Sequence, residues 1–259
     1  TGSPLPQETI DICKASDSVL LGAVGGPKWD NCKERPEKGL LGIRKALGLY
    51  SNLRPSILKP QLKDASPLKD EKLEKGLNVM VVRELTGGIY VGERRNAEDG
   101  SWASDEEKYS VEEVTRIAKI AFETAMLRDK RVVSVDKANV LDSSKLWRRT
   151  VEEVAKDYPG IELDDWYIDI MTANLVNPAI RNQFQVFVLP NLYGDIITDE
   201  AAQIQGGVGT AGSANMGDRY SMFEAIHGSA PRMIEEGLGH FANPSSILKA
   251  EAMLLRHIC

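Results

Sequence analysis

The stretch QGGVGTAGSANMG, Gln205–Gly217, decides how the fold of this chain is interpreted, because residues 207–212 spell the pattern G-x-G-x-x-G. In a Rossmann domain this glycine loop directly follows a strand, opens a helix and precedes an acidic residue by about 20 positions. Here residues 199–205 continue a helical pattern, and the following SANMGDRY (213–220) is no helix start. We therefore predict that the glycines form a helix exit and a loop, and that this is not a Rossmann site.

Around this stretch, short apolar runs alternate with helical patterns. Buried strands are expected at residues 18–24, 77–82, 131–135 and 186–189, which are short, rich in branched residues and not alternating. Ser110, with Glu113 three residues later, forms a capping box ahead of an amphipathic helix. A second helix is predicted in SSKLWRRTVEEVAKDYPG, residues 143–160. This alternation indicates an α/β fold with a largely parallel core.

Composition excludes several classes of protein. The 259 residues carry a net charge of −6 and no evident Lys/Arg stripe, which argues against a nucleic-acid partner. No apolar run approaches the roughly 18 residues of a membrane span, so no membrane partner is expected. The three cysteines, Cys13, Cys32 and Cys259, are few and widely spaced. We expect a reducing, cytoplasmic compartment, no disulfide framework and no zinc site.

Polar residues follow three of the predicted strands. Arg83 and then Tyr90 follow the strand at 77–82, Lys137 and Asn139 follow that at 131–135, and PNLYGD, ending in Asp195, follows that at 186–189. In open α/β sheets, ligands bind beyond the carboxyl ends of strands. Any one of these residues alone is more often part of a surface ion pair, but their convergence on strand ends predicts a functional site.

A pair of carboxylates gives the sharpest local signal. Asp195 and Asp199 are four residues apart in a helical run, so both side chains project from one face. Carboxylate oxygens suit Mg²⁺ or Mn²⁺. The alternative is a solvated acidic face, which Ile196 and Ile197 on the other side would support.

Arginines form a second signal. Arg44, Arg54 and Arg83 carry planar guanidinium forks that pair with carboxylates, which would suit a substrate with two carboxylates and a hydroxyl. The alternative is that these arginines lie on the surface and that the neighbouring Leu40 and Leu41 belong to a helix core.

A third signal is the compact turn His227-Gly228-Ser229, whose backbone N–H groups are available to a phosphate or ribose. The alternative is a structural histidine.

Six stretches together carry a resemblance that covers nearly the whole chain. They are LLGAVGGPKWD (20–30), RPEKGLLGIRKALGLYSNLRP (35–55), VRELTGGIYVGE (82–93), VSVDKANVL (133–141), NLYGDIITDEA (191–201) and FEAIHGSAP (223–231). They resemble the β-decarboxylating 2-hydroxyacid dehydrogenases, the isocitrate/isopropylmalate dehydrogenase family. The resemblance implies a two-domain α/β fold with a mixed sheet and flanking helices, which binds NAD(P) without a classical Rossmann fold.

The same resemblance implies a domain division. Residues 1–49 and 206–259 correspond to a discontinuous cofactor-binding domain, and residues 50–205 to a domain for substrate binding and dimerisation, with an arm at about 93–110. The family's opening strand with its glycine-rich turn, and its C-terminal helical end, have no counterpart in the chain, so we expect a fragment that lacks both ends.

The implied reaction is the NAD-dependent, metal-requiring oxidative decarboxylation of a 2-hydroxy acid. Where the isocitrate branch offers Ser and Asn to a third carboxylate, this chain has Lys38 and Leu40, with Leu41 alongside. An apolar pair suits an isopropyl group, which favours 3-isopropylmalate as substrate, 2-oxoisocaproate as product and a place in leucine biosynthesis. YIDIMTANLV (167–176) and the stretch from residue 205 onward resemble the NAD-linked isocitrate branch, so isocitrate or homoisocitrate remains an alternative. A non-catalytic regulatory or dimer-partner subunit is the alternative of another class.

Residue roles are carried over only at matching positions. Arg44, Arg54 and Arg83 match substrate-binding arginines, and Tyr90 and Lys137 match the catalytic acid/base pair, in which the lysine serves the neighbouring subunit of a homodimer. Asp169, close to the substrate and contributed across the dimer, matches a metal ligand together with Asp195 and Asp199. The matching cofactor-binding residues are Gly26, Glu37, Asn139, His227, Gly228, Ser229, Ala230, Pro231 and Asn243. Arg232 stands where an aspartate commonly binds the ribose of NAD, which makes NADP the alternative cofactor.

Overall fold

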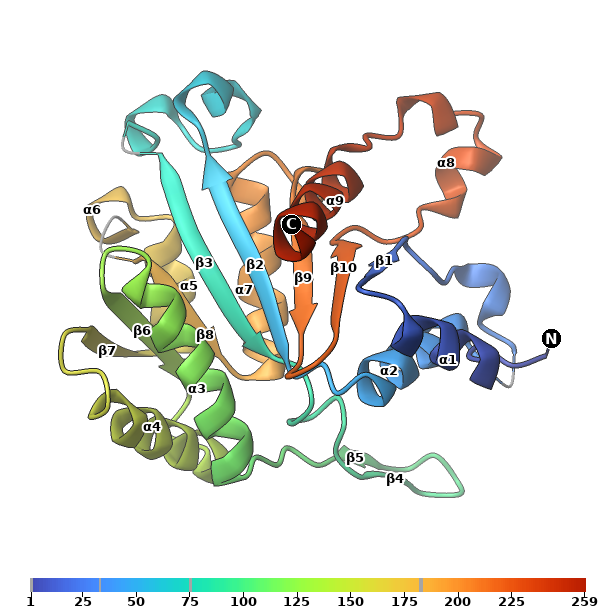
Figure 1. Ribbon diagram of the computed structural model, residues 1–259, viewed down its shortest axis with the longest axis horizontal. Coiled ribbons are helices and arrows are strands. Elements are labelled where there is room, and N and C mark those ends of the chain that lie inside the picture. The colour runs from blue at the N-terminus through green and yellow to red at the C-terminus, as the bar shows by residue number, and fades with distance from the viewer. Residues whose placement is uncertain (1, 33, 75, 182–183) are drawn as a thin grey trace. The chain divides into compact units, whose positions relative to one another are not determined.

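The computed structural model describes residues 2–32, 34–74, 76–181 and 184–259, and the chain divides into two compact units (Figure 1). The first unit comprises Thr1–Arg54 and Gly206–Cys259, and the second comprises Pro55–Gln205. The boundaries expected from the sequence were 49/50 and 205/206. The predicted α/β fold with a mixed sheet and flanking helices is confirmed.

Four parallel strands form the centre of the second unit. Their order is β3 (Leu77–Glu84), β8 (Val186–Leu189), β6 (Arg131–Asp136) and β7 (Glu162–Tyr167). All four residues of β8 are buried, as expected for a continuous apolar run covered on both faces. The parallel direction brings the carboxyl ends of these strands to one edge of the sheet.

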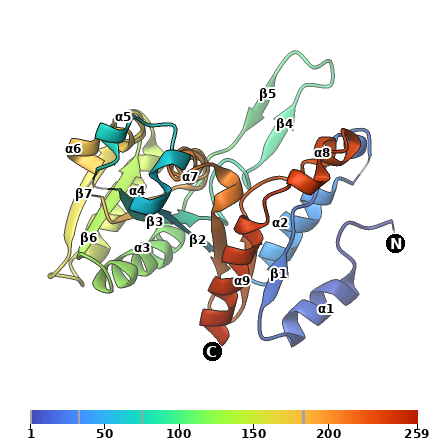
Figure 2. The same cartoon turned by 90° about the horizontal axis from the view of Figure 1, so that it is seen from above.

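Helices cover both faces of these strands (Figures 1 and 2). On one face lie α3 (Val111–Met126) and α4 (Asp142–Ala155), and on the other lie α5 (Ile168–Leu175) and α7 (Asn191–Ile204). The short helix α6 (Pro178–Arg181) contacts α5.

The predicted capping box is confirmed at the start of α3. Ser110 Oγ accepts a hydrogen bond from Glu113 N at 3.2 Å, and Ser110 N donates to Glu113 Oε2 at 2.8 Å. Both groups would otherwise be unsatisfied at a helix start, so the sequence sets this boundary locally.

Other parts of the second unit are irregular or short. The 3₁₀ turns η2 (Pro60–Ala65) and η3 (Asp70–Lys72) precede β3. The predicted arm contains an antiparallel hairpin of β4 (Arg94–Asn96) and β5 (Ala103–Asp105), all of whose residues are exposed.

The first unit is built around mixed strand pairs. Strand β1 (Val19–Leu21) runs parallel to β10 (Ser221–Ala225), while β10 and the start of β2 (Ser51–Leu58) both run antiparallel to β9 (Gly212–Met216). Helix α9 (Ser245–Ile258) packs on β9 and β10. The remaining elements are α1 (Gln7–Ala15), η1 (Pro27–Trp29), α2 (Pro36–Ala46), η4 (Val208–Thr210), α8 (Pro231–Glu235) and η5 (Gly239–Phe241).

The structure corrects part of the interpretation of residues 205–217. Helix α7 ends at Ile204, and Gly206 and Gly207 take φ values of 116° and 104°, so the helix exit is confirmed. The prediction of a loop is wrong for residues 212–216, which form β9. A Cβ on Gly212 would lie 2.6 Å from the backbone nitrogen of Ala250, so this glycine allows α9 to approach the strand.

Two further expectations are corrected. The buried strand expected at residues 18–24 is limited to Val19–Leu21, which lies at one end of the strand order of the described residues, and Leu20 is 45% exposed. The largely parallel core holds for β3, β8, β6 and β7, whereas β9 is antiparallel to both neighbours. Strands β2, β4, β5, β7, β9 and β10 were not predicted from the sequence.

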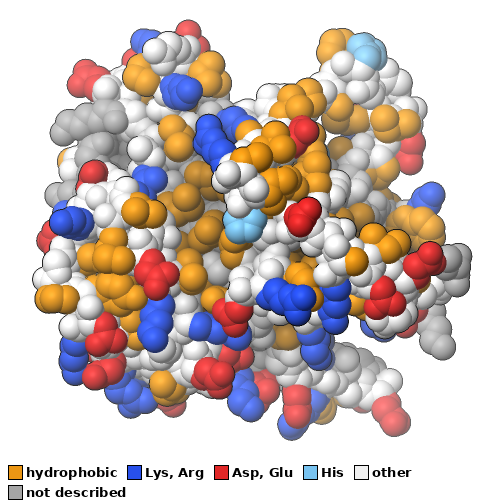
Figure 3. All heavy atoms as spheres, in the orientation of Figure 1, with side chains coloured by type: hydrophobic (Ala, Val, Ile, Leu, Met, Phe, Trp, Pro, Cys, Tyr) orange, Lys and Arg blue, Asp and Glu red, His pale blue; other side chains and the backbone are white. Residues whose placement is uncertain are grey.

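The surface view shows Lys and Arg side chains interspersed with Asp and Glu on the visible face (Figure 3). That face therefore presents no uniform basic surface of the kind that binds nucleic acid. Within the described ranges, none of the helices combines the length and apolar character that crossing a membrane requires.

Candidate active site

Three predicted site residues meet in the second unit. Arg83, at the end of β3, forms an ion pair through Nη1 with Asp195 Oδ1 on α7. The hydroxyl of Tyr90 donates to the other carboxylate oxygen of Asp195 at 3.0 Å. The Arg83 side chain is 6% exposed, whereas that of Asp195 is 41% exposed and therefore accessible to a ligand.

The surroundings keep Tyr90 protonated. Burial of the phenol raises its pKa, and the neighbouring carboxylate of Asp195 adds to the increase, while Arg83 acts in the opposite direction. A phenol in this state is a proton donor at neutral pH, which is the role expected of a general acid.

A buried glutamate that the sequence analysis missed shapes the turn between Arg83 and Tyr90. Glu84 is fully buried and accepts hydrogen bonds from Thr86 N at 2.8 Å, Thr86 Oγ1 at 2.5 Å and Gly87 N at 2.7 Å. Burial raises the pKa of Glu84 despite these bonds and the guanidinium of Arg116 at 3.6 Å. The available signal was a charged residue directly before T-G-G, where a carboxylate can fold the turn onto itself.

Lys137 and Asp169 form a separate pair in the same unit. Lys137, just after β6, donates to Asp169 Oδ1 at 2.6 Å, and this hydrogen bond lowers the pKa of Asp169. The adjacent Asp136 is fully buried and receives a two-pronged bond from Arg148 at 2.8 and 2.9 Å. Asp136 also accepts from Ala138 N at 2.8 Å, so it fixes the turn that carries Lys137.

The three predicted metal ligands are not gathered within one chain. Asp195 and Asp199 lie one turn apart on α7, whereas Asp169 lies in the first turn of α5 and pairs with Lys137. Among the described residues, no group of three or more His, Cys, Asp or Glu side chains is placed to hold a metal ion. The contribution of Asp169 across a dimer therefore stays a prediction.

The other two predicted substrate arginines lie in the first unit. Arg44, on α2, pairs with Glu224 at 2.6 Å, and Asn215 donates to the same carboxylate oxygen at 2.9 Å. Glu224 is 6% exposed, and these two donors stabilise its buried carboxylate. Arg54, on β2, is 7% exposed.

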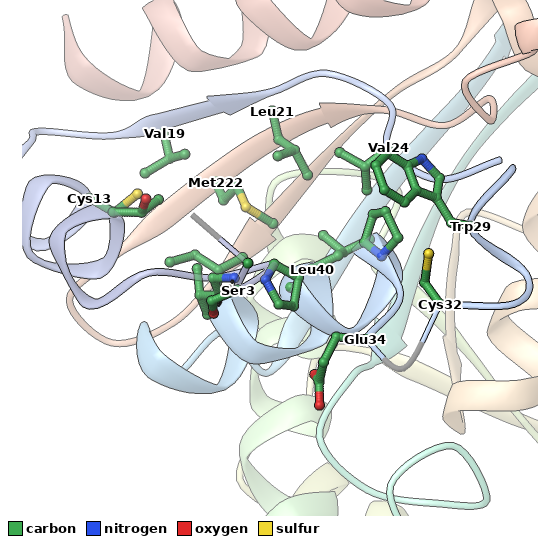
Figure 4. A pocket seen from close by; sticks show the side chains of 17 residues that line it. Ser3, Cys13, Val19, Leu21, Val24, Trp29, Cys32, Glu34, Leu40 and Met222 are labelled. Carbon is green, nitrogen blue, oxygen red and sulfur yellow. Dashed lines mark hydrogen bonds between the residues drawn. The ribbon is translucent and has the colours of Figure 1, made fainter.

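The structure separates the two leucines predicted to select the substrate. Leu40 lines a cavity of about 760 Å³ within the first unit, together with apolar side chains such as those of Val19, Ile43 and Met222 (Figure 4). Leu41 is 50% exposed on the same helix, α2. The two leucines therefore face different surroundings, and their role in substrate selection stays a prediction.

Four predicted cofactor-binding residues cluster around the turn at Gly25 and Gly26. Ser229 Oγ donates to the carbonyl oxygen of Gly25 at 2.7 Å, and a Cβ on Gly26 would lie 3.3 Å from the ring of Pro231. A Cβ on Gly25 would lie 2.2 Å from the carboxylate of Glu37. Glycine at both positions lets Glu37 and the turn from 229 to 231 approach the backbone closely, and the φ values of 101° and 147° also favour it.

The remaining residues of the HGSAP turn continue this cluster along the chain. His227 Nδ1 lies 2.8 Å from the carbonyl oxygen of Gly228. Ala230 takes a left-handed conformation, with φ of 44°, directly before α8.

Three other cofactor-related residues lie outside this turn, and one of them, Arg232, directly follows it. Asn243 Oδ1 accepts from Ser245 N, the first N–H of α9, at 2.9 Å. Arg232 pairs with Glu236 at 2.5 Å, which offsets part of its charge. Asn139 is exposed, just beyond β6 in the second unit.

Comparison with known proteins agrees with this arrangement. The family model described as isocitrate/isopropylmalate dehydrogenase matches residues 1–259. The chain is 52% identical to a 3-isopropylmalate dehydrogenase of Clostridium acetobutylicum, over 99% of the chain and 72% of that protein, and 49% identical to one of Aquifex aeolicus, over 99% and 70%.

A solved structure gives the same result at the level of the fold. The crystal structure of isocitrate dehydrogenase from Methylococcus capsulatus superposes with a TM-score of 0.86 at 34% identity, over 99% of this chain and 72% of that chain. The fold, the grouping of Arg83, Tyr90 and Asp195, and these similarities lead to one conclusion: the chain belongs to the isocitrate/isopropylmalate dehydrogenase family.

Proposed function

We propose that this protein oxidises 3-isopropylmalate with NAD and releases CO₂ to give 2-oxoisocaproate, a step of leucine biosynthesis. The observation that carries the proposal is the identity of 49–52% with proteins named 3-isopropylmalate dehydrogenase over 99% of the chain. The meeting of Arg83, Tyr90 and Asp195 supports it, because it places a cation, a proton donor and a carboxylate at one point.

In this proposal the arginines orient the substrate. Arg44, Arg54 and Arg83 bind its two carboxylates, since guanidinium groups form two-pronged bonds with carboxylates. Leu41, which is half exposed on α2, offers apolar surface to the isopropyl group, and Leu40 supports the same helix from the cavity side.

Asp195 and Asp199, with Asp169 of a second subunit, suit a divalent metal ion. The donor set consists of carboxylate oxygens, as Mg²⁺ and Mn²⁺ prefer, and two of the three project from consecutive turns of α7. Bound there, the ion would polarise the oxygen on C2 of the substrate and stabilise negative charge on it.

The turn formed by Gly26, Glu37 and residues 227–231, with Asn243 and Asn139, is proposed to hold NAD, which supplies the hydride acceptor. The close approach of this turn to the backbone of Gly25 and Gly26 fits a ligand bound through main-chain groups. Arg232 makes NADP the alternative, although its pairing with Glu236 weakens its attraction for a phosphate.

The side chains of the protein then move two protons. Lys137 of the neighbouring subunit accepts the proton of the C2 hydroxyl as the hydride leaves C2. After CO₂ departs from C3, the electron pair left there takes a proton from Tyr90. The hydrogen bond that Tyr90 donates to Asp195 supports this role, because it restrains the phenol beside a proposed metal ligand. This scheme requires a homodimer, and the three free cysteines favour a cytoplasmic location.

A turnover screen of the full-length protein tests the proposal. It would compare 3-isopropylmalate, isocitrate, homoisocitrate, malate and tartrate, each with NAD and NADP and with Mg²⁺ or Mn²⁺. We expect 3-isopropylmalate with NAD to give the highest kcat/KM. A preference for isocitrate, the substrate named for the similar Methylococcus structure, would replace the substrate assignment, and turnover of none of them would indicate a non-catalytic subunit.

The metal assignment has its own test. Asp195→Asn removes one charge from the proposed ligand set, so the concentration of Mn²⁺ for half-maximal activity should rise by at least about tenfold. An unchanged metal response would exclude Asp195 from the metal site.

A further inference from the structure

We infer that Asn191 and Gly194 are positioning residues that orient Arg83 toward the substrate, and that Asn191 does so without adding a second negative charge beside Asp195. This inference rests on the proposed role of Arg83 in binding a substrate carboxylate. All the residues involved lie in the second unit.

The amide oxygen of Asn191 binds one edge of the guanidinium. Arg83 Nε donates to Asn191 Oδ1 at 3.1 Å, and Arg83 Nη2 donates to the same oxygen at 2.8 Å, while Nη1 reaches Asp195. Asn191 and Asp195 are four residues apart on α7, so their side chains lie on one face. Arg83 therefore lies along the first turn of this helix, held at two points.

Asn191 itself has no freedom to move. It is 2% exposed, its Nδ2 donates to the carbonyl oxygen of Gly87 at 3.1 Å, and its backbone N donates to the hydroxyl of Tyr109 at 2.8 Å. The same turn at Gly87 is held by Glu84. The orientation of Arg83 is thus tied to the turn that leads to Tyr90.

Gly194 provides the space for the stem of Arg83. A Cβ at this position would lie 2.5 Å from Cγ and 2.8 Å from Cβ of Arg83, which are atoms close to the backbone and cannot swing away. Glycine inside a helix normally costs about 1 kcal/mol relative to alanine, so its presence on α7 needs a packing reason. The contact with Arg83 supplies that reason.

The chemistry of the acceptor matters as much as its position. A carboxylate at residue 191 would hold the guanidinium equally well, but beside Asp195 it would be the second negative charge on one cation and would make the cluster net negative. The neutral amide keeps the charges of Arg83 and Asp195 balanced, so the cluster repels a dianionic substrate less than it would with a carboxylate at residue 191.

Three variants and one control test the inference in the full-length protein. Asn191→Leu removes the acceptor at similar volume, Gly194→Ala displaces the stem of Arg83 while keeping Asn191, and Asn191→Asp keeps an acceptor but adds charge. The control Thr150→Val deletes a buried hydroxyl whose bond, to Leu146 O at 2.8 Å on α4, is in the same unit.

Two readouts are measured for each variant. The first is the rate at which phenylglyoxal modifies Arg83, followed by peptide mass spectrometry without substrate, cofactor or metal, with Arg148 in the same sample as internal control for unfolding. The second is KM and kcat for 3-isopropylmalate. We expect N191L and G194A to label Arg83 at least about fivefold faster and to raise KM about ten- to hundredfold, with kcat changed much less.

N191D should keep the slow labelling of Arg83 and still raise KM at least about tenfold. The control T150V should change neither readout. Unchanged labelling and KM in both N191L and G194A would overturn the positioning role, and an unchanged KM in N191D would overturn the argument about charge. If N191L unfolds, shown by faster labelling of Arg148, the other two variants decide. Absence of turnover in the wild type would contradict the proposed function, while labelling would still decide whether Asn191 and Gly194 hold Arg83.

Discussion

Asp195 is the residue at which the site is most tightly organised. Each of its carboxylate oxygens binds one side chain, Arg83 on one and Tyr90 on the other, so the positions of the cation and the proton donor depend on one another. The side chain is nevertheless 41% exposed, which leaves the carboxylate accessible to a ligand. At the scale of the residue, the proposed catalysis depends on the bonds from Arg83 and Tyr90 to Asp195, and a single substitution can remove either of them.

Replacement of Tyr90 by Phe tests the proton donor. The ring keeps its packing, but the hydroxyl that donates to Asp195 at 3.0 Å is lost. We expect kcat for oxidative decarboxylation to fall by at least about a hundredfold, with a much smaller change in KM, because general acid catalysis contributes on this order. Steady-state kinetics would check this, and a kcat within about threefold of wild type would exclude Tyr90 as the acid.

Asp165 is a residue whose charge destabilises the fold. Burial raises the pKa of Asp165 to about 6. The guanidinium of Arg148, 4.0 Å away, lowers this pKa only in part, because it donates its hydrogen bonds to Asp136. Because the pKa of Asp165 is higher in the folded than in the unfolded protein, the folded state is favoured while this carboxyl is protonated. That contribution to the free energy of unfolding is present at low pH and is lost as the pH rises through about 6.

Asp165→Asn should therefore stabilise the protein at pH 8 by about 1 kcal/mol, after allowance for solvent screening, and the gain should shrink between pH 8 and pH 5. Urea unfolding at several pH values would measure it. The matched variant Asp164→Asn removes a partner of Arg131 at 3.0 Å and should show no such gain. Equal effects of the two variants at pH 8 would contradict the assignment to Asp165.

At the scale of elements, two helices of the second unit begin for different reasons. One begins where local hydrogen bonds satisfy its first N–H groups, and the other begins directly after a strand and carries site residues in its first turns. Helix α3 starts at a capping box of Ser110 and Glu113, whereas α7 starts immediately after β8 and places Asn191, Gly194 and Asp195 in its first turns. The first boundary is set by local sequence, and the second serves the site.

Ser110→Ala tests the local boundary. Loss of the bond from Glu113 N at 3.2 Å should lower the free energy of unfolding by about 1 kcal/mol, with an unchanged denaturant slope. Ser101→Ala in the exposed hairpin loop, where the hydroxyl binds only the neighbouring Asp99 in the described contacts, should cost less than about 0.5 kcal/mol. An equal loss in both variants would show that the cap contributes nothing specific.

At the scale of the whole molecule, the proposed site needs two chains. Lys137 pairs with Asp169 within the chain, and Tyr90 pairs with Asp195, but none of the hydrogen bonds described above joins the two pairs. A symmetric dimer in which each chain lends Lys137 and Asp169 to its partner would bring both pairs together twice.

Heterodimers test this sharing of residues. A dimer of one Tyr90→Phe chain and one Lys137→Ala chain, purified through two different tags, contains one fully wild-type site if the sites are shared. We expect about half of the wild-type kcat per dimer, although each parent homodimer is nearly inactive. Activity equal to the mean of the two parents would show that each site lies within one chain.

Much of the fold followed from local patterns. The apolar runs at 131–135 and 186–189 and the helix after Ser110 were predicted because burial and capping are encoded in neighbouring residues. Strands β9 and β10 were missed, since glycine and polar residues such as Ser213 and Asn215 form strand only where pairing and α9 cover them. Tertiary burial overrode local propensity there.

The sequence by itself determined the family through its six motifs. It also predicted that Arg83, Tyr90 and Asp195 converge where strands end, because chemistry-bearing residues follow buried strands in a readable order. Only the tertiary structure decided how these residues are held. Asn191, Gly194 and Glu84 act through contacts with Arg83 and with the turn before Tyr90, and such contacts depend on how β3 and α7 pack together. Residue spacing along the chain fixes which side chains are available, whereas packing fixes the distances and charges among them.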